Sequence, residues 1–192
     1  MVALPFAVPA PARDGEKARI VDLLTEVEEG KVLVSFALEG AVDEKLEQRI
    51  ASGLATGIVF DFALVRVRKG WFNKNVKTGS LQVIVMYNAV SREYLVNYKH
   101  DGDLIESRLI RDLEELYAIL TRIERLEIFS LAGLDGEHLH VRVRAELGTR
   151  SILFFIPSIR ATDWAESQRF RVGTNGQAAE EAGKGERKKD EE

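Results

Sequence analysis

Apolar and polar residues alternate along much of this chain, and the alternation predicts strands. The cleanest example is residues 139–147, where every second side chain is apolar. We expect the apolar set to lie in a core and the polar set to face water or a partner. The apolar set is Leu139, Val141, Val143, Ala145 and Leu147, and the polar set is His140, Arg142, Arg144 and Glu146.

At least seven strands follow from similar patterns and from the tight turns between them. The predicted strands cover residues 18–27, 31–39, 58–68, 81–88, 92–99, 103–109, 126–131 and 139–147, with 151–156 as a candidate last strand that ends at Pro157. Asp101-Gly102 predicts a two-residue hairpin turn. The polar segment 73–80 is expected to be a connection.

Two short stretches have helical spacing instead. Residues 44–52 follow Asp43, a favourable N-cap, and end before Gly53. Residues 111–123 place apolar side chains three or four positions apart. The predicted fold is therefore mainly β, an antiparallel β-sandwich or curved sheet with two short helices, with an α+β arrangement as the alternative.

The two ends of the chain differ from the middle. Residues 1–14 are apolar and end in small residues, which is typical of the remnant of a signal peptide, although no Lys or Arg precedes Arg13. An upstream start would complete that signal, and a disordered leader on a cytoplasmic protein is the alternative. Residues 15–173 are expected to form a single β-rich domain, and residues 174–192 a disordered charged tail.

Composition narrows the possible functions. A formal net charge of -4 argues against a general nucleic-acid binder. The chain has no cysteine, which removes disulfides and thiolate chemistry. No apolar run is long enough to predict a transmembrane segment. We expect no nucleic acid and no cofactor among its partners, whereas a peripheral membrane contact stays open.

Basic residues interleaved with aromatics form the most distinctive surface feature. Such a combination can bind acidic partners or lipid headgroups, and the alternative is a solvated strand face with Trp71 packed in the core. The candidate partner-binding residues are Arg66, Arg68, Lys69, Trp71 and Phe72 around one strand end, and Arg142 and Arg144 on a second strand.

Catalytic and metal-binding patterns are weak. His138 and His140 point to one side of a predicted strand and could bind a metal if His100 or Glu146 supplied a third ligand, but the two nearby arginines disfavour a cation. There is no Gly-x-Ser-x-Gly nucleophile motif. We therefore expect no catalytic residues and no metal site.

A family resemblance rests on several short motifs. They are Ser52-Gly53 before the long strand, Arg66 and Arg68 near its end, Trp71, the run 87–94 (YNAVSREY), the run 142–147 (RVRAEL), and Asp163-Trp164 with Ser167. In this order they resemble a bacterial domain of unknown function, family 4390. The resemblance implies an exported bacterial protein and implies no activity.

The sequence thus favours a non-catalytic interaction or structural module of the bacterial envelope, in the periplasm or exported, with an envelope protein as partner. Contact would be made through a sheet edge or through the aromatic-basic loop, the segment with Lys69, Trp71 and Phe72 after the strand at 58–68. One alternative is a protein that binds a small apolar ligand between the curved sheet and the helix at 111–123. An enzyme of unrecognised type is a weaker alternative.

Overall fold

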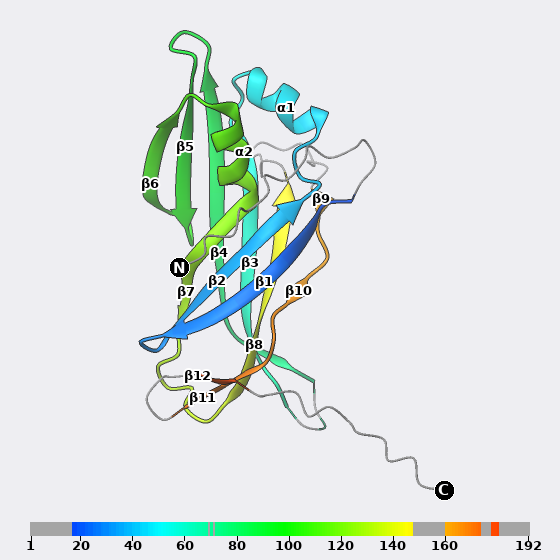
Figure 1. The fold of residues 1–192 in the computed structure, drawn as a ribbon, viewed down its shortest axis with the longest axis vertical. Coiled ribbons are helices and arrows are strands. Elements are labelled where there is room, and N and C mark those ends of the chain that lie inside the picture. Colours follow the sequence, from blue (N-terminus) through cyan, green and yellow to red (C-terminus); the bar gives the residue numbers. More distant parts are fainter. Residues whose placement is uncertain (1–16, 69, 71, 148–159, 174–177, 181–192) are drawn as a thin grey trace, which may run out of the picture.

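The computed structural model describes residues 17–68, 70, 72–147, 160–173 and 178–180, the last three as backbone. In this part of the chain the strands form a three-stranded and a nine-stranded sheet. The smaller sheet crosses in front of the larger one (Figure 1). The fold is mainly antiparallel β with two short helices, and the sequence-based prediction of fold class is confirmed.

Four consecutive strands, each joined to the next by a turn or loop, build one half of the large sheet. They are β3 (Thr56–Arg66), β4 (Lys74–Asn88), β5 (Glu93–His100) and β6 (Asp103–Ile110). Each pairs with the next in antiparallel register, and β6 ends the row. The turn between β5 and β6 is Asp101-Gly102, in which both residues have positive φ, as the sequence predicts.

The other half of the large sheet grows from β8 (His138–Leu147), which pairs with β3 on the side away from β4. Short strands follow along the second edge of β8. They are β9 (Arg160–Ala161), β10 (Ala165–Glu166) and β11 (Phe170–Val172), and β12 (Ala178–Glu180) pairs with β11.

The small sheet consists of β1 (Arg19–Glu28), β2 (Lys31–Glu39) and β7 (Arg122–Ser130), with β2 in the centre. Every second residue of β2 is buried, from Val32 to Leu38. These side chains face the buried row of β3, and the rings of Phe36 and Phe60 meet edge to face with their centroids 5.2 Å apart. The core is therefore the layer between the two sheets.

Two helices lie at the upper end of the sandwich (Figure 1). Helix α1 (Glu44–Ala51) begins at Asp43, whose side chain accepts the N–H of Leu46 at 2.9 Å, and α2 (Leu113–Thr121) begins at Asp112 in the same way. The hydroxyl of Tyr117 in α2 donates to Glu47 in α1 at 3.0 Å. Burial, together with this bond to a carboxylate, raises the pKa of Tyr117 to about 12.

Several predicted boundaries are wrong, and two of the differences matter for the fold. Residues 74–80 belong to β4 rather than to a connection, because they continue the ladder with β3 even though their side chains are mostly polar. The predicted helix at 111–123 stops at Thr121, because the backbone is extended at Arg122, where β7 starts. The candidate strand at 151–156 and the leader at 1–14 lie outside the described residues, as does most of the tail at 174–192.

The alternation in β8 is confirmed for its apolar face, where all five side chains are buried. The opposite face is not simply solvent-exposed, and our expectation is wrong for His140 and Glu146, which are both buried. The segment that carries β9 and β10 runs beside β8 and brings Trp164 and Glu166 against that face.

Candidate functional site

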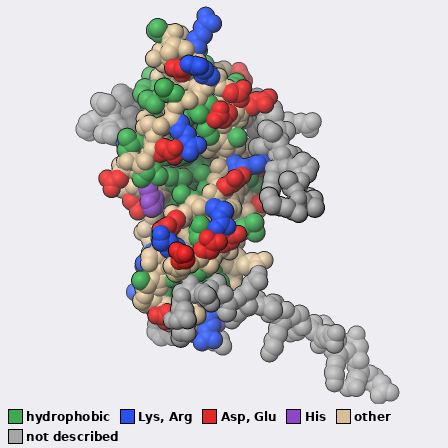
Figure 2. All heavy atoms as spheres, turned by 60° about the vertical axis from the view of Figure 1, so that its left-hand side comes forward, with side chains coloured by type: hydrophobic (Ala, Val, Ile, Leu, Met, Phe, Trp, Pro, Cys, Tyr) green, Lys and Arg blue, Asp and Glu red, His purple; other side chains and the backbone are tan. Residues whose placement is uncertain are grey.

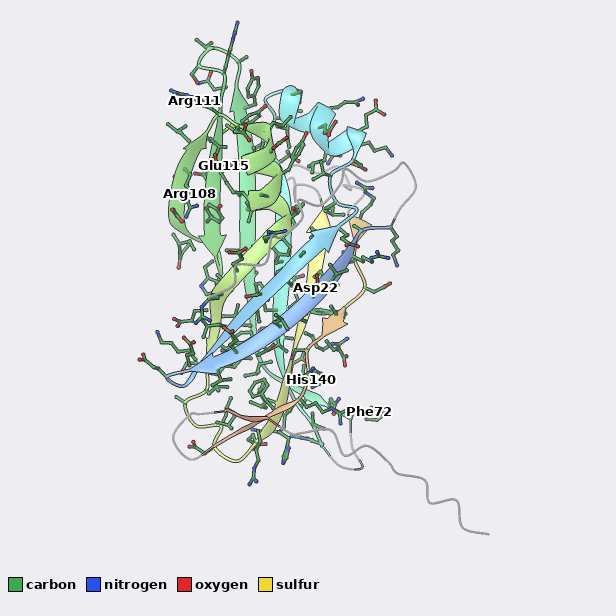
Figure 3. All side chains as sticks on the ribbon, viewed as in Figure 1. Asp22, Phe72, Arg108, Arg111, Glu115 and His140 are labelled. Carbon is green, nitrogen blue, oxygen red and sulfur yellow. The ribbon has the colours of Figure 1, made fainter. Side chains whose placement is uncertain are left out.

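The hairpin between β3 and β4 carries the first group of candidate residues. Phe72 is 96% exposed and lies at the lower end of the molecule (Figure 3). Arg68 is exposed, and its backbone N–H donates to the side chain of Asn73 at 3.4 Å. Arg66 forms an ion pair with Glu137 at 2.9 Å. Lys69 and Trp71 lie outside the described residues.

Arg142 and Arg144 are far less available than the sequence indicates. Both guanidinium groups stack on the ring of Trp164, at 5.0 and 4.9 Å from its centroid. Arg142 also pairs with Glu166 at 3.2 Å, and Arg144 with Asp61 at 2.8 Å. Each arginine side chain keeps only about one third of its exposure. These residues form a packed polar layer on β8.

The two groups of arginines do not form one surface. Arg66 stands opposite Leu139 in the β3–β8 register, so it shares the face that packs on the small sheet. Arg142 and Arg144 lie on the other face of the same sheet. The alternation along each strand shows which of its residues share a face. Only the register between β3 and β8 shows that Arg66 lies on the opposite face from Arg142 and Arg144.

His140 is enclosed in the polar layer of β8, with a side chain that is 3% exposed. Its Nε2 lies 3.7 Å from a carboxylate oxygen of Glu166. Burial lowers the pKa of His140, and this effect is larger than the opposite effect of the Glu166 carboxylate, which raises the pKa. The positive charges of Arg169 and Arg142 lower the pKa further. Within the described ranges no three His, Asp or Glu side chains are placed to hold a metal ion.

A different surface, which sequence reasoning did not single out, lies at β6. This strand is the end of the large sheet, and no other strand in the described part of the chain pairs with its free edge. Seven of its eight residues are exposed. They include Leu104, Ile105 and Leu109, which are 59%, 57% and 66% exposed. An open edge offers a row of backbone N–H and C=O groups to another chain.

Charged residues line the inner side of this edge. Glu106 and Arg108 stand opposite Tyr98 and Val96 of β5, so they share the face that is turned toward the small sheet. The Glu106 carboxylate receives two hydrogen bonds from Arg108, at 2.6 and 3.1 Å, which lower the pKa of Glu106. The guanidinium of Arg108 also lies over the Tyr98 ring, 5.5 Å from its centroid. Arg108 and Glu115 are labelled in Figure 3.

A groove of about 500 Å³ separates β6 from α2 and β7. It exists because the small sheet ends at β7 and does not extend over β5 and β6. The groove is lined by apolar side chains, among them Leu81, Ile119, Ile123 and Leu126, and by charged residues on either side. Figure 2 shows apolar side chains near the middle of this side of the molecule, with charged groups around them.

The sequence contained one signal for the open edge. The segment 103–110 (DLIESRLI) lacks the strict alternation of a strand with one buried face, because its apolar residues come in neighbouring pairs. Such a pattern fits a strand that is only half covered. Nothing in it identifies which strand would be its neighbour.

No helix in the described part of the chain is long and apolar enough to cross a membrane. Among known proteins, a family model described as Domain of unknown function (DUF4390) matches residues 15–155. The candidate residues Arg66, Arg68, Arg142 and Arg144 and the whole of β6 lie inside this match, whereas Trp164 lies beyond it. No curated protein and no solved structure matches the chain.

Proposed function

This chain belongs to the family of the domain of unknown function DUF4390, and from that premise we propose that it is a non-catalytic interaction module of the bacterial envelope. Its contact would be made by strand addition at β6. The observation that carries the proposal is the open edge of β6, with three large apolar side chains in water.

Strand addition uses two kinds of interaction. Backbone groups on the free edge of β6 would bond to an extended segment of the partner and supply affinity. Leu104, Ile105 and Leu109 would lose water contact against that segment, and each fully buried side chain of this size stabilises a contact by about 1.5–3 kcal/mol. A rim of charges, including Glu106 and Arg108, would select among partners.

The envelope location rests on the sequence of residues 1–14 and on their resemblance to the end of a signal peptide. A periplasmic or exported protein meets many membrane and cell-wall proteins, which suits a module whose role is contact. The hairpin residues Arg68 and Phe72 are a second candidate contact, at the other end of the large sheet from α1.

Photo-crosslinking in bacterial cells that produce the protein would test the proposal. A photoreactive residue replaces Leu109 in one strain and Leu24 in another. Both are leucines on an outer strand, exposed to 66% and 65%. We expect a discrete adduct from position 109, recovered with the envelope fraction, and none from position 24. Equal labelling from both positions, or recovery of the intact chain in the cytosol, would contradict the proposal.

A second candidate function uses the groove beside β6. Its size of about 500 Å³ and its apolar lining suit a small apolar ligand held between the sheet and α2. Ile119→Trp would narrow the groove by placing a larger side chain in its lining. If native mass spectrometry of the protein purified from its host shows a bound small molecule that this variant lacks, the ligand-binding function is favoured over the contact function.

A further inference from the structure

We propose that the occupant of the β6 edge is a second copy of this chain, paired antiparallel to the first about a two-fold axis through Ser107. The inference rests on the proposed function, which makes β6 the contact strand, and it adds the identity of the partner. It comes from the self-complementary order of charges in β6.

Antiparallel pairing of β6 with itself about Ser107 places Glu106 of each copy opposite Arg108 of the other. Directly opposed residues in an antiparallel pair share a face. Glu106 and Arg108 already lie on one face of the large sheet. Two opposite-charge pairs therefore meet at the centre of the contact, one on each side of the axis.

The chemistry of the two side chains permits this without breaking the existing ion pair. Within one copy, Arg108 uses Nε and Nη2 to bond the Glu106 carboxylate. A guanidinium has two more hydrogens on Nη1, which a second carboxylate can accept. Because bonds from Arg108 lower the pKa of Glu106, the carboxylate is ionised at neutral pH. The result would be a ring of four alternating charges.

The same charges select the register. If one strand slides by two residues in either direction, Glu106 meets Glu106, or Arg108 meets Arg108. Like charges directly opposite each other destabilise a strand pair. Of these three registers, the one centred on Ser107 alone places Glu106 opposite Arg108 on both sides of the axis.

Charged side chains that point inward from an edge strand often prevent edge pairing, because an incoming strand would have to bury them without partners. A second β6 is the occupant that removes this penalty, since it brings the opposite charge to each position. A β-bulge interrupts the β5–β6 register between Glu106 and Leu104. Ile105 is the extra residue of this bulge, so the regular contact is centred on residues 106–108.

Two charge-reversal variants and their mixture test the pairing by analytical ultracentrifugation of the full chain. Glu106→Arg puts positive charge at both positions of every copy, and Arg108→Glu puts negative charge at both. Each variant alone would oppose like charges. In an equimolar mixture, one copy of each variant restores both opposite-charge pairs.

We expect a dimer of the wild-type chain, a dissociation constant at least about tenfold higher for each variant alone, and recovery of the dimer in the mixture. Recovery also shows that both variants are folded. A monomeric wild-type chain, variants that dimerise as tightly as wild type, or a mixture that stays monomeric would each overturn the inference. A monomeric chain that still gives a position-109 adduct with a different protein would overturn only the second-copy partner and leave the proposed function in place.

Discussion

The hydroxyl of Thr162 accepts a hydrogen bond from the backbone N–H of Ala145 at 3.0 Å, and the N–H of Thr162 returns a bond to the carbonyl of Ala145 at 2.9 Å. Ser167 repeats the arrangement with Val141, with both distances at 2.9 Å. Two side-chain hydroxyls thus replace strand carbonyls along the second edge of β8. The segment 160–172 is fastened to the sheet although its strands are only two or three residues long.

The hydrogen bond between the Ala145 N–H and the Thr162 hydroxyl predicts that removing this hydroxyl lowers the stability of the fold. Thr162→Val keeps the shape of the side chain but leaves the buried N–H of Ala145 without an acceptor, which costs about 1–3 kcal/mol. Thr162→Ser keeps the hydroxyl and should cost less. Urea unfolding of the two variants checks this, and equal losses would mean that packing, rather than the hydrogen bond, holds the segment.

The contacts of Arg144 in the polar layer indicate that this arginine stabilises the fold, which the sequence pattern of β8 does not predict. Arg144→Ala removes the partner of Asp61, whose side chain is 22% exposed, and one of the two groups stacked on Trp164. We expect a loss of about 1–3 kcal/mol in the free energy of unfolding. Arg111→Ala, which breaks an ion pair in which Arg111 itself is largely exposed, should cost no more than about 1 kcal/mol. If the two variants unfold at the same denaturant concentration, the layer is not structural.

His140 predicts that stability falls in mild acid. Its pKa is lowered from an ordinary value of 6.5 by burial, so the unfolded chain binds this proton more readily than the folded chain. The stability that depends on neutral His140 is present above about pH 6.5 and is lost as the pH falls toward the folded-state pKa. Glu166 opposes the shift, whereas Arg169 and Arg142 strengthen it.

Denaturant unfolding at pH 8, 6 and 5 measures this effect against His140→Gln, a side chain that does not titrate. The wild-type chain should lose stability more steeply than the variant over this range. Parallel curves for the two proteins would show that other groups account for the acid sensitivity.

The backbone of β4 lies so close to Gly57 that we expect no larger residue to fit at this position. A Cβ at this position would lie 2.0 Å from the carbonyl oxygen of Val83 on the neighbouring strand. Gly57→Ala must therefore shift backbone and should cost more than about 2 kcal/mol. Gly79→Ala, on the same pair of strands, meets its nearest atoms at 3.4 Å and should change stability by less than about 1 kcal/mol. Thermal unfolding of both variants gives the comparison, and similar melting temperatures would contradict it.

We expect Phe72 to contribute to partner binding and not to the stability of the fold. Because its side chain is 96% exposed, Phe72→Ala should leave the free energy of unfolding within about 0.5 kcal/mol of wild type. If the hairpin is a second contact surface, the same variant combined with Arg68→Ala should reduce binding to an envelope partner captured through position 109. Unchanged capture would remove the hairpin from the candidate surfaces, and a large loss of stability would show that Phe72 packs on the body.

The features that the sequence predicts are those encoded within a single element. The alternation of β8 identifies its five buried apolar residues, and Asp43 caps α1 as expected, because both depend on near neighbours in the chain. The extension of β4 through residues 74–80 is missed because its polar side chains hide a ladder that only the facing strand β3 reveals. The short strands of 160–172 have no periodicity to detect, since two hydroxyls replace part of their backbone bonding.

The candidate site depends even more on contacts between distant segments. Whether Arg142 faces water is decided by Trp164 and Glu166, which come from a separate segment. Whether β6 is an edge is decided by the strand order of the large sheet, in which no described strand follows it. A pattern along one strand contains neither fact.

The pairing of β2 with β7 has a consequence for the order of assembly. Strand β2 receives its second neighbour only after residues 40–121 have been made, since Lys31 stands opposite Ser130 and Ala37 opposite Arg122. At ordinary rates of synthesis, about 5–20 residues per second, that interval lasts about 4–16 s. Strands β3 to β6 pair with one another in sequence order, and this half of the large sheet can form during that interval, before β8 joins β3. The nascent β1–β2 hairpin, with Val32, Val34 and Phe36 on one side, must wait, and we expect it to be the part of the growing chain that most needs a chaperone.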